Sequence, residues 1–245
     1  KINAGSIVFA MYSRGYRTGG FTQLSSDPSQ PPLFAYQPEY SNNIEVGVKN
    51  TLFHNRVQFN AAVFYSTITD VQVPTLVLPD AITVTKNAGK LNSKGFEMEL
   101  SAIAVKGLDV DYNFGYTKAV YKNLKLAQYG NVTNLDGKKQ IFTPDVTSML
   151  AVQYSYLLSK KLALKLTARG EWKYAGKQYF DLSNSISQGS YNVFNSQAGI
   201  SFKQLSCMIW ARNLGGKKYI AYAYDFGAVH LGDPKTYGIT LSLRL

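Results

Sequence analysis

Hydrophobic and polar residues alternate along most of the chain. In the final segment, every second residue from Tyr237 to Leu245 is hydrophobic, and the residues between them are Gly238, Thr240, Ser242 and Arg244. Because successive side chains of a β-strand point to opposite faces of its sheet, a period of two predicts a strand with one apolar and one polar face. The same period recurs in segments 57–66, 96–102, 108–117, 149–156 and 162–169. The chain is therefore expected to be all-β.

The connections between these segments alternate strictly between short and long. Ten extended segments are expected, beginning near Ser6, Tyr40, Arg56, Ile82, Gly107, Pro144, Lys161, Ser190, Ser206 and Pro234. The short connections are residues 53–56, 105–107, 159–160 and 204–205, and the long ones are residues 19–38, 74–81, 125–143, 178–189 and 215–233. This rhythm is typical of outer-membrane β-barrels, whose short turns face the periplasm and whose long loops face outward. Both ends of the chain are then expected on the periplasmic side.

Strands with one apolar and one polar face fit two architectures. In a soluble sandwich the apolar face is buried between two sheets, whereas in a membrane barrel it contacts lipid and the polar face lines the lumen. The expected strands are longer than the about 5–6 residues of a usual strand. Aromatic residues such as Tyr154, Trp172 and Tyr237 lie toward their ends, where membrane interfaces favour them. We therefore predict an antiparallel up-and-down transmembrane β-barrel in one domain, residues 1–245, with a sandwich as the alternative.

Composition argues against several other classes of function. The chain has 245 residues and a net charge of +11, but its Lys and Arg residues are dispersed, which argues against a nucleic-acid partner. Cys207 is the single cysteine and His54 and His230 are the two histidines, so we expect no internal disulfide, metal site or resident cofactor. The sequence contains no nucleophile elbow and no phosphate-binding loop, and we expect no enzymatic activity. No apolar run approaches the about 18 residues of a spanning helix.

Four acidic residues fall on the polar faces of adjacent expected strands, namely Glu97, Glu99, Asp109 and Asp111. Paired carboxylates can perform acid–base catalysis, but acids are also the ordinary lining of a wet barrel lumen. We interpret them as a polar lumen wall that faces a plug or is balanced by cations. The expected cations are Lys165, Arg169, Lys173 and Arg244.

Several motifs follow one another along the chain. They are YSRGYRTGGF (12–21), PEY (38–40) with NIEVGVK (43–49), NAG (87–89) with KGFEMEL (94–100), WARNL (210–214) with KY (218–219), and GDPKTYG (232–238). In this order they resemble the C-terminal part of the β-barrel of TonB-dependent outer-membrane receptors, and they are similar to its ferric-siderophore branch.

This resemblance implies that the ten strands correspond to the last ten of a 22-stranded barrel in the bacterial outer membrane. The implied function is energy-coupled uptake of a scarce nutrient, with a ferric-siderophore complex as the expected ligand. The implied partners are the plug domain and TonB, through an N-terminal part missing from this sequence, and outer-membrane lipid and lipopolysaccharide. The sequence begins with Lys1 and has no secretory signal, so we expect a C-terminal piece of a longer polypeptide. It ends in Leu245, where the family usually has an aromatic residue.

Two segments are candidates for contact with the ligand. Segment 12–21 would place arginines at the outer rim, where they can bind an anionic iron chelate, lipopolysaccharide phosphates or lumen carboxylates. Segment 219–226 is rich in aromatic residues, which can hold an aromatic chelator or a sugar, or can extend a hairpin above the membrane. The expected ligand contacts are Arg14, Tyr16, Arg17, Phe21, Tyr179, Tyr222, Tyr224 and His230. The alternative function is a self-contained small outer-membrane β-barrel that acts as a pore or adhesin.

Overall fold

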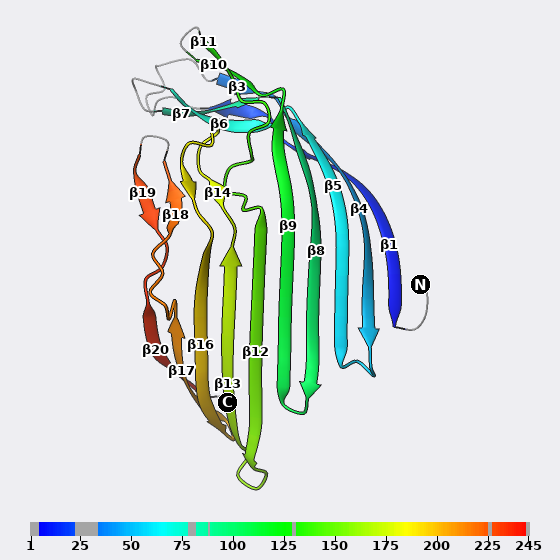
Figure 1. Cartoon of the computed structure of the whole chain (residues 1–245), viewed down its shortest axis with the longest axis vertical. Coiled ribbons are helices and arrows are strands. Elements are labelled where there is room, and N and C mark those ends of the chain that lie inside the picture. Colours follow the sequence, from blue (N-terminus) through cyan, green and yellow to red (C-terminus); the bar gives the residue numbers. More distant parts are fainter. Residues whose placement is uncertain are drawn as a thin grey trace.

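The computed structural model describes residues 5–22, 34–77, 82–87, 89–128, 131–224 and 227–243, and its regular elements there are β-strands (Figure 1). The long strands are β1 (Ser6–Arg17), β4 (Glu39–Leu52), β5 (Val57–Thr69), β8 (Lys90–Val105), β9 (Leu108–Lys122), β12 (Val146–Ser159), β13 (Leu164–Ala175), β16 (Tyr191–Phe202), β17 (Leu205–Arg212) and β20 (Thr236–Leu243). They form one ten-stranded sheet in this same order, and every neighbouring pair is antiparallel. The ten antiparallel strands expected from the sequence are confirmed.

Each long connection carries a two-stranded hairpin beyond the end of the main sheet (Figure 1). The hairpin strands are β2 (Gly20–Thr22) with β3 (Phe34–Tyr36), β6 (Gln72–Val77) with β7 (Ile82–Asn87), β10 (Lys125–Gln128) with β11 (Asn131–Asn134), β14 (Gln178–Tyr179) with β15 (Ser187–Gln188), and β18 (Ile220–Ala223) with β19 (Val229–Leu231). The short turns lie at the opposite end of the sheet. Their tight geometry uses left-handed backbone at Phe53, His54 and Asn55 in the first turn and at Gly107 in the second.

The start of the fourth long strand differs from the sequence-based prediction. It was expected near Ile82, but Ile82–Asn87 is the separate strand β7 of an outer hairpin, and β8 begins at Lys90. The chain turns between them at Gly89, where φ is +57° and a Cβ atom would lie 2.6 Å from the carbonyl oxygen of Lys122. Asn87 fixes this corner, because its amide nitrogen donates to the carbonyl oxygens of Gln37 (2.8 Å) and Asp70 (2.7 Å).

The register of the sheet aligns the apolar positions of neighbouring strands. One row of directly opposed residues runs Ala10, Val46, Val63, Phe96, Tyr116 and Val146 across six strands. A second row runs Tyr112, Leu150, Trp172 and Phe194. Since a slip by one residue would move every side chain to the other face, these rows show that the hydrophobic alternation sets the register.

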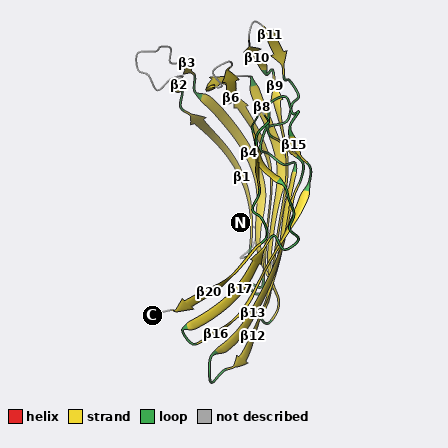
Figure 2. Ribbon diagram, turned by 90° about the vertical axis from the view of Figure 1, so that its left-hand side faces the viewer, coloured by secondary structure: helices red, strands yellow, loops and turns green. Residues whose placement is uncertain are grey.

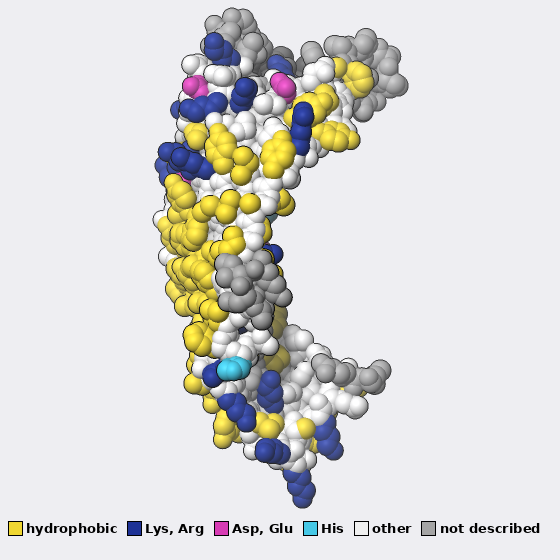
Figure 3. Space-filling model, turned by 90° about the vertical axis from the view of Figure 1, so that its right-hand side faces the viewer, with side chains coloured by type: hydrophobic (Ala, Val, Ile, Leu, Met, Phe, Trp, Pro, Cys, Tyr) yellow, Lys and Arg dark blue, Asp and Glu magenta, His cyan; other side chains and the backbone are white. Residues whose placement is uncertain are grey.

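The sheet is strongly curved, and its two faces differ in chemistry. Figure 2 shows the curvature, and Figure 3 shows a hydrophobic belt on the convex side with Lys and Arg side chains above and below it. Many belt side chains are exposed, with Val63 at 53% and Leu241 at 77%. Tyr154 and Tyr156 lie on this face near the short turns, and Trp172 lies near the outer loops. This is the arrangement of a barrel wall with an outward apolar band and aromatic girdles.

The exposed belt decides between the two architectures expected from the sequence. A sandwich would bury these side chains under a second sheet, yet in the described residues the further sheets are the two-stranded outer hairpins. The wall is nevertheless open. Within the described ranges, β1 pairs with β4 alone and β20 pairs with β17 alone, so the chain forms a curved wall rather than a closed barrel.

The buried cluster of the molecule lies where the outer hairpins meet the strand ends. It consists of Val71, Val73, Leu91, Ala119, Tyr121, Leu124 and Leu135. The side chain of Glu39 supports this region by accepting a hydrogen bond from the backbone nitrogen of Gln72 at 2.7 Å. The outer hairpins near β8 and β9 are therefore packed onto the sheet. Among the described residues, no helix has the length and apolar character of a membrane span.

Candidate functional site

The concave face of the sheet carries a groove of about 1200 Å³ between β8 and β20. Charged and amide side chains line its lower part, including Glu99, Arg169 and Gln197, and the rings of Tyr191 and Tyr219 line it toward the outer loops. The groove thus joins a polar wall to an aromatic outer mouth.

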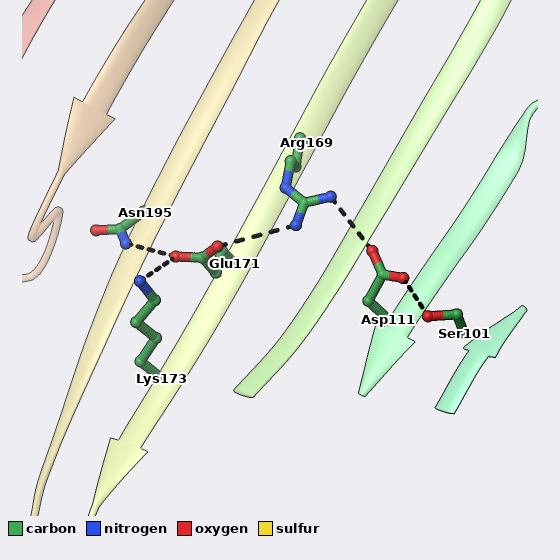
Figure 4. A network of polar contacts seen from close by, with 6 residues as sticks. All are labelled: Ser101, Asp111, Arg169, Glu171, Lys173 and Asn195. Atoms are coloured by element: carbon green, nitrogen blue, oxygen red, sulfur yellow. Dashed lines mark hydrogen bonds and ion pairs between the residues drawn. The ribbon is translucent and has the colours of Figure 1, made fainter. Parts of the chain in front are cut away.

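A network of polar contacts crosses the wall from β8 to β16 (Figure 4). The hydroxyl of Ser101 donates to Asp111 Oδ1 at 2.9 Å, and Arg169 lies 3.5 Å from Asp111 Oδ2 and 3.9 Å from Glu171 Oε2. Glu171 Oε1 in turn lies 2.9 Å from Lys173 Nζ and accepts a hydrogen bond from Asn195 Nδ2 at 2.8 Å. Each acid in this network is held by a cation or an amide.

The structure shows partners for two of the four lumen acids that the sequence singled out. Asp111 is balanced by Arg169, and Glu99 accepts a hydrogen bond from Asn60 Nδ2 at 3.3 Å. Glu97 also lines the groove. The interpretation as a polar wall fits this geometry, with Arg169 and Lys173 as balancing cations. Lys165 makes no ion pair within the described part of the chain, and Arg244 lies outside the described residues.

Asn213 connects this wall to the last outer loop. Its side chain is buried, with 3% of the residue exposed, and its backbone nitrogen donates to Asn195 Oδ1 at 3.0 Å. Its Nδ2 atom donates to the carbonyl oxygens of Lys217 (2.9 Å) and Asp233 (3.0 Å), and its Oδ1 atom accepts from the nitrogen of Lys217 (2.8 Å). Asn213 therefore holds both ends of the last loop through its side chain, and its backbone joins them to Asn195, the residue that binds Glu171.

Aromatic residues from three outer loops meet at the mouth. The ring of Phe142 stacks on Tyr222, with centroids 5.0 Å apart and an interplanar angle of 14°, and lies 5.7 Å from the ring of Phe180. Tyr222 makes an edge contact with Tyr224 at 4.7 Å. We call Phe142, Phe180, Tyr222 and Tyr224 the mouth cluster. Phe142 and Tyr222 are each 41% exposed, so the cluster presents open ring surface to a ligand.

Cations flank the mouth cluster. The ammonium of Lys177 lies 4.8 Å from the centre of the Tyr179 ring, and that of Lys139 lies 6.0 Å from the same ring. Lys139 also pairs with Asp145, whereas Lys177 has no ion pair among the residues that the structure describes. The backbone nitrogen of Phe142 donates to the carbonyl oxygen of Tyr179 at 2.8 Å, which joins these residues to the cluster. The mouth can therefore attract an anion and stack an aromatic group.

Asp181 holds the loop that carries Tyr179 and Phe180. Its carboxylate accepts hydrogen bonds from the hydroxyl of Ser183, from the hydroxyl (2.8 Å) and nitrogen (3.1 Å) of Ser185, and from the nitrogen of Ile186 (2.6 Å). Burial raises the pKa of this carboxyl group, but the hydrogen bonds outweigh burial and lower the pKa below its ordinary value of 3.8. The carboxylate is thus ionised at neutral pH and fixes the loop beneath the mouth.

The chain matches a known family over most of its length. Residues 1–214 match the family model of the β-barrel of TonB dependent receptor-like proteins. The chain belongs to the TonB-dependent receptor family. Proteins of this family lie in the bacterial outer membrane, and the apolar belt on the convex face is suited to contact with its lipid. We call the curved ten-stranded sheet the receptor wall.

The receptor wall is similar to part of several curated receptors. It is 24% identical over 228 residues to the pesticin receptor of Yersinia pestis, covering 90% of this chain and 31% of that protein. It is 24% identical over 212 residues to the ferrioxamine receptor of Yersinia enterocolitica, covering 84% of this chain and 28% of that protein. The chain therefore spans less than a third of the length of these relatives.

Solved structures share the fold of the receptor wall. The ferric yersiniabactin uptake receptor of Yersinia pestis aligns with a TM-score of 0.81 at 21% identity, over 99% of this chain and 35% of that chain. The siderophore receptor PiuA of Acinetobacter baumannii aligns with a TM-score of 0.78 at 19% identity, over 99% and 34% of the two chains. These likenesses show that the ten-stranded sheet is a TonB-dependent receptor fold.

The structure divides the eight residues that the sequence proposed as ligand contacts. Tyr179, Tyr222 and Tyr224 lie at or beside the mouth cluster, and His230 is directly opposite Tyr222 in the β18–β19 pair. Arg17 is on the concave face of β1 opposite Glu39, because it is in phase with the lumen positions of that strand. Phe21 is 67% exposed on the first outer hairpin.

Arg14 and Tyr16 lie on the other face of β1. They are in phase with Tyr12, Val8 and the rest of the convex belt. The guanidinium of Arg14 lies 5.5 Å from the centre of the Tyr40 ring, and the rings of Tyr16 and Tyr40 are 6.5 Å apart. Whether any of the eight contacts a ligand stays a prediction, but this placement turns Arg14 and Tyr16 toward lipid rather than the groove.

Sequence reasoning missed several residues of the mouth. Lys139 and Phe142 come from one loop, Lys177 and Phe180 from another, and neither loop has a regular period. Only folding brings the two loops together and places Phe142 on Tyr222. Asn213 lies inside the WARNL motif (210–214), but its role in holding the last loop was not predicted. Its backbone is left-handed, with φ of +48°, a conformation that Asn adopts more readily than most residues. Within the described ranges, no group of three or more His, Cys, Asp or Glu side chains is placed to hold a metal ion.

Proposed function

We propose that this chain is the C-terminal part, residues 1–245, of a 22-stranded receptor barrel that takes up a ferric-siderophore complex across the outer membrane. The open edges at β1 and β20 support this, because the remaining strands of a larger barrel would pair with them. In this proposal a plug domain fills the concave side, TonB supplies the energy through that plug, and lipid with lipopolysaccharide surrounds the convex side.

The observation that carries the proposal is the mouth. The exposed rings of Phe142 and Tyr222 are stacked, Phe142 is hydrogen-bonded to Tyr179, and Lys177 lies over the Tyr179 ring without an acidic partner among the described residues. A groove of about 1200 Å³ runs along the concave face of the same sheet. Ferric siderophores are commonly anionic chelates with aromatic or amide groups, which such a surface can stack and attract. The similarity to a ferric yersiniabactin uptake receptor and to a ferrioxamine receptor supports the same ligand class.

In this proposal the wall performs no covalent chemistry. Three of its acids, Glu99, Asp111 and Glu171, are engaged in ion pairs or amide contacts. The alternative of a self-contained pore or adhesin requires β1 to pair with β20, and in the described part of the sheet these strands are its two free edges. The geometry therefore favours the receptor.

The experiment uses the intact receptor that contains this chain, with ferric yersiniabactin and ferrioxamine B as probes. Binding of at least one of these chelates is expected, with weaker binding of the iron-free form. Phe142→Ala with Tyr222→Ala should weaken that binding about tenfold or more, because each lost ring contact is worth about 0.5–1.5 kcal/mol beyond its buried area.

Tyr237→Ala serves as the matched control, because it removes an exposed ring from the convex face of β20. It should leave chelate affinity unchanged. Absence of binding to every ferric chelate tested, by a receptor that inserts normally, would overturn the proposed function. Equal affinity of the Phe142→Ala/Tyr222→Ala variant would overturn the assignment of the mouth.

A further inference from the structure

The cations of the convex face are concentrated on two adjacent strands. Across the paired positions of the ten described strands, this face carries five cations and no Asp or Glu. One is Arg14 on β1. The other four, which we call the lysine quartet, are Lys90, Lys94, Lys118 and Lys122.

The lysine quartet consists of two directly opposed pairs. Lys94 faces Lys118, and Lys90 faces Lys122, across the β8–β9 ladder. Directly opposed side chains have Cβ atoms about 5 Å apart, and like charges in such pairs repel each other. All four side chains are exposed, and none belongs to an ion pair in the part of the chain that the structure describes. The sheet thus holds an uncompensated cluster of positive charge.

The quartet lies immediately above the apolar belt. Phe96 and Tyr116 are the last belt residues on these strands, and Lys94 and Lys118 are the next convex positions toward the outer loops. On β9 the belt runs from Leu108 to Tyr116, about 26 Å along the strand at 3.3 Å per residue, comparable with the about 25 Å apolar band of outer-membrane barrels. Figure 3 shows cations above the belt on this side. The first lysine pair therefore lies at the depth of lipid headgroups.

The second pair extends the charge outward. Lys90 and Lys122 are four residues beyond the first pair, about 13 Å along the strands. A single phosphate could not contact both pairs, whereas a lipid with several phosphates at different depths could. Lysine stems can lie along apolar surface while their ammonium groups bind such phosphates. This geometry matches a multiply phosphorylated glycolipid of the outer leaflet.

We propose that the lysine quartet is a binding site for the phosphate groups of lipopolysaccharide. The proposal relies on the proposed function only for the orientation, in which the long loops face outward. Phosphates between the opposed lysines relieve their mutual repulsion, and the fixed ammonium groups do the work that divalent cations otherwise do between neighbouring lipopolysaccharide molecules. The fifth cation of this face, Arg14 on β1, lies over the Tyr40 ring, three strands away from β8.

The test measures binding of lipid A to the intact receptor by native mass spectrometry in detergent. The probes are bis-phosphorylated lipid A and the same lipid A with its phosphates removed. The wild type is expected to prefer the phosphorylated form, and Lys94→Gln/Lys118→Gln to weaken that binding about 30-fold, or about fivefold per lysine. The control Lys49→Gln/Lys165→Gln removes the same charge from the concave face and should bind as the wild type does.

Two further arms keep the outcome decisive. Raising the ionic strength should weaken binding of phosphorylated lipid A to the wild type by screening, and inorganic phosphate should weaken it no more than another salt does at the same ionic strength. Equal binding of both lipids by the wild type, insensitivity to ionic strength, additional displacement by free phosphate, or unchanged affinity of the Lys94→Gln/Lys118→Gln variant would each overturn the site. Ferric-chelate binding should be the same in the wild type and all variants. If the proposed function is wrong, the wild type will fail to bind ferric chelates, whatever its affinity for lipid A.

Discussion

At the scale of single residues, Asn213 connects the last outer loop to the polar wall. Its amide makes three hydrogen bonds to the two ends of the last loop, and its backbone binds Asn195 on the wall. Asn195 binds Glu171, which pairs with Lys173. A change at the mouth that moves the last loop must therefore disturb Asn213, and through it the polar wall that faces the lumen.

This role predicts the behaviour of Asn213→Gly in the intact receptor. Glycine accepts the left-handed backbone at this position but removes the buried amide, whose lost hydrogen bonds cost about 1–3 kcal/mol. The last loop should open more often, and trypsin should cleave after Lys217 and Lys218 about tenfold faster than in the wild type.

Asn113→Ala is the control for this experiment. Asn113 lies on the same wall, but in the described structure its side chain makes no hydrogen bond, so its removal should leave cleavage unchanged. Equal cleavage of Asn213→Gly and the wild type would show that other contacts hold the loop.

At the scale of elements, the sequence predicted the strands well because two solvents act on each of them. Lipid selects apolar side chains on one face and water selects polar side chains on the other, so the period of two is strong in β9, β13 and β20. The predicted start of the fourth long strand was wrong, because the extended segment at Ile82 belongs to the separate strand β7. The corner at Gly89 that separates β7 from β8 depends on the nearby Lys122 carbonyl and on the hydrogen bonds of Asn87, which no sequence period reveals. The mouth cluster was missed in part, because aromatic stacking between loops has no sequence period.

The two faces of a strand predict opposite responses to charge. Ala198 and Gln197 are adjacent on β16, with Ala198 on the convex belt opposite Ala168 and Ile209, and Gln197 in the groove. Ala198→Arg should destabilise the folded receptor in lipid by about 2–4 kcal/mol, whereas Gln197→Arg should have little effect.

Urea unfolding of the receptor in phospholipid vesicles measures this difference directly. Equal stability of the Ala198→Arg and Gln197→Arg variants would mean that the belt does not contact hydrocarbon at β16.

At the scale of the whole molecule, the described strands form a curved wall with an apolar outside, a polar inside and two free edges. The sequence led to an expected barrel, whereas the described strands form an open wall; in the proposed function, further strands of a larger barrel would pair with its two edges. Toward the outer loops the groove along the polar wall is lined by Tyr191 and Tyr219, and the mouth cluster belongs to the outer loops beyond the strand ends. The account depends on the convex face meeting lipid and the concave face meeting water.

Spin-label accessibility along β16 tests that dependence most directly. Single labels at each position from Tyr191 to Phe202 would be placed in the intact receptor in bilayers, with Cys207 replaced by serine. We predict that accessibility to oxygen peaks at the even-numbered positions, such as 194, 198 and 200, and that accessibility to a water-soluble nickel chelate peaks at the odd-numbered positions between them. A profile without this alternation, or with its phase reversed, would contradict the account.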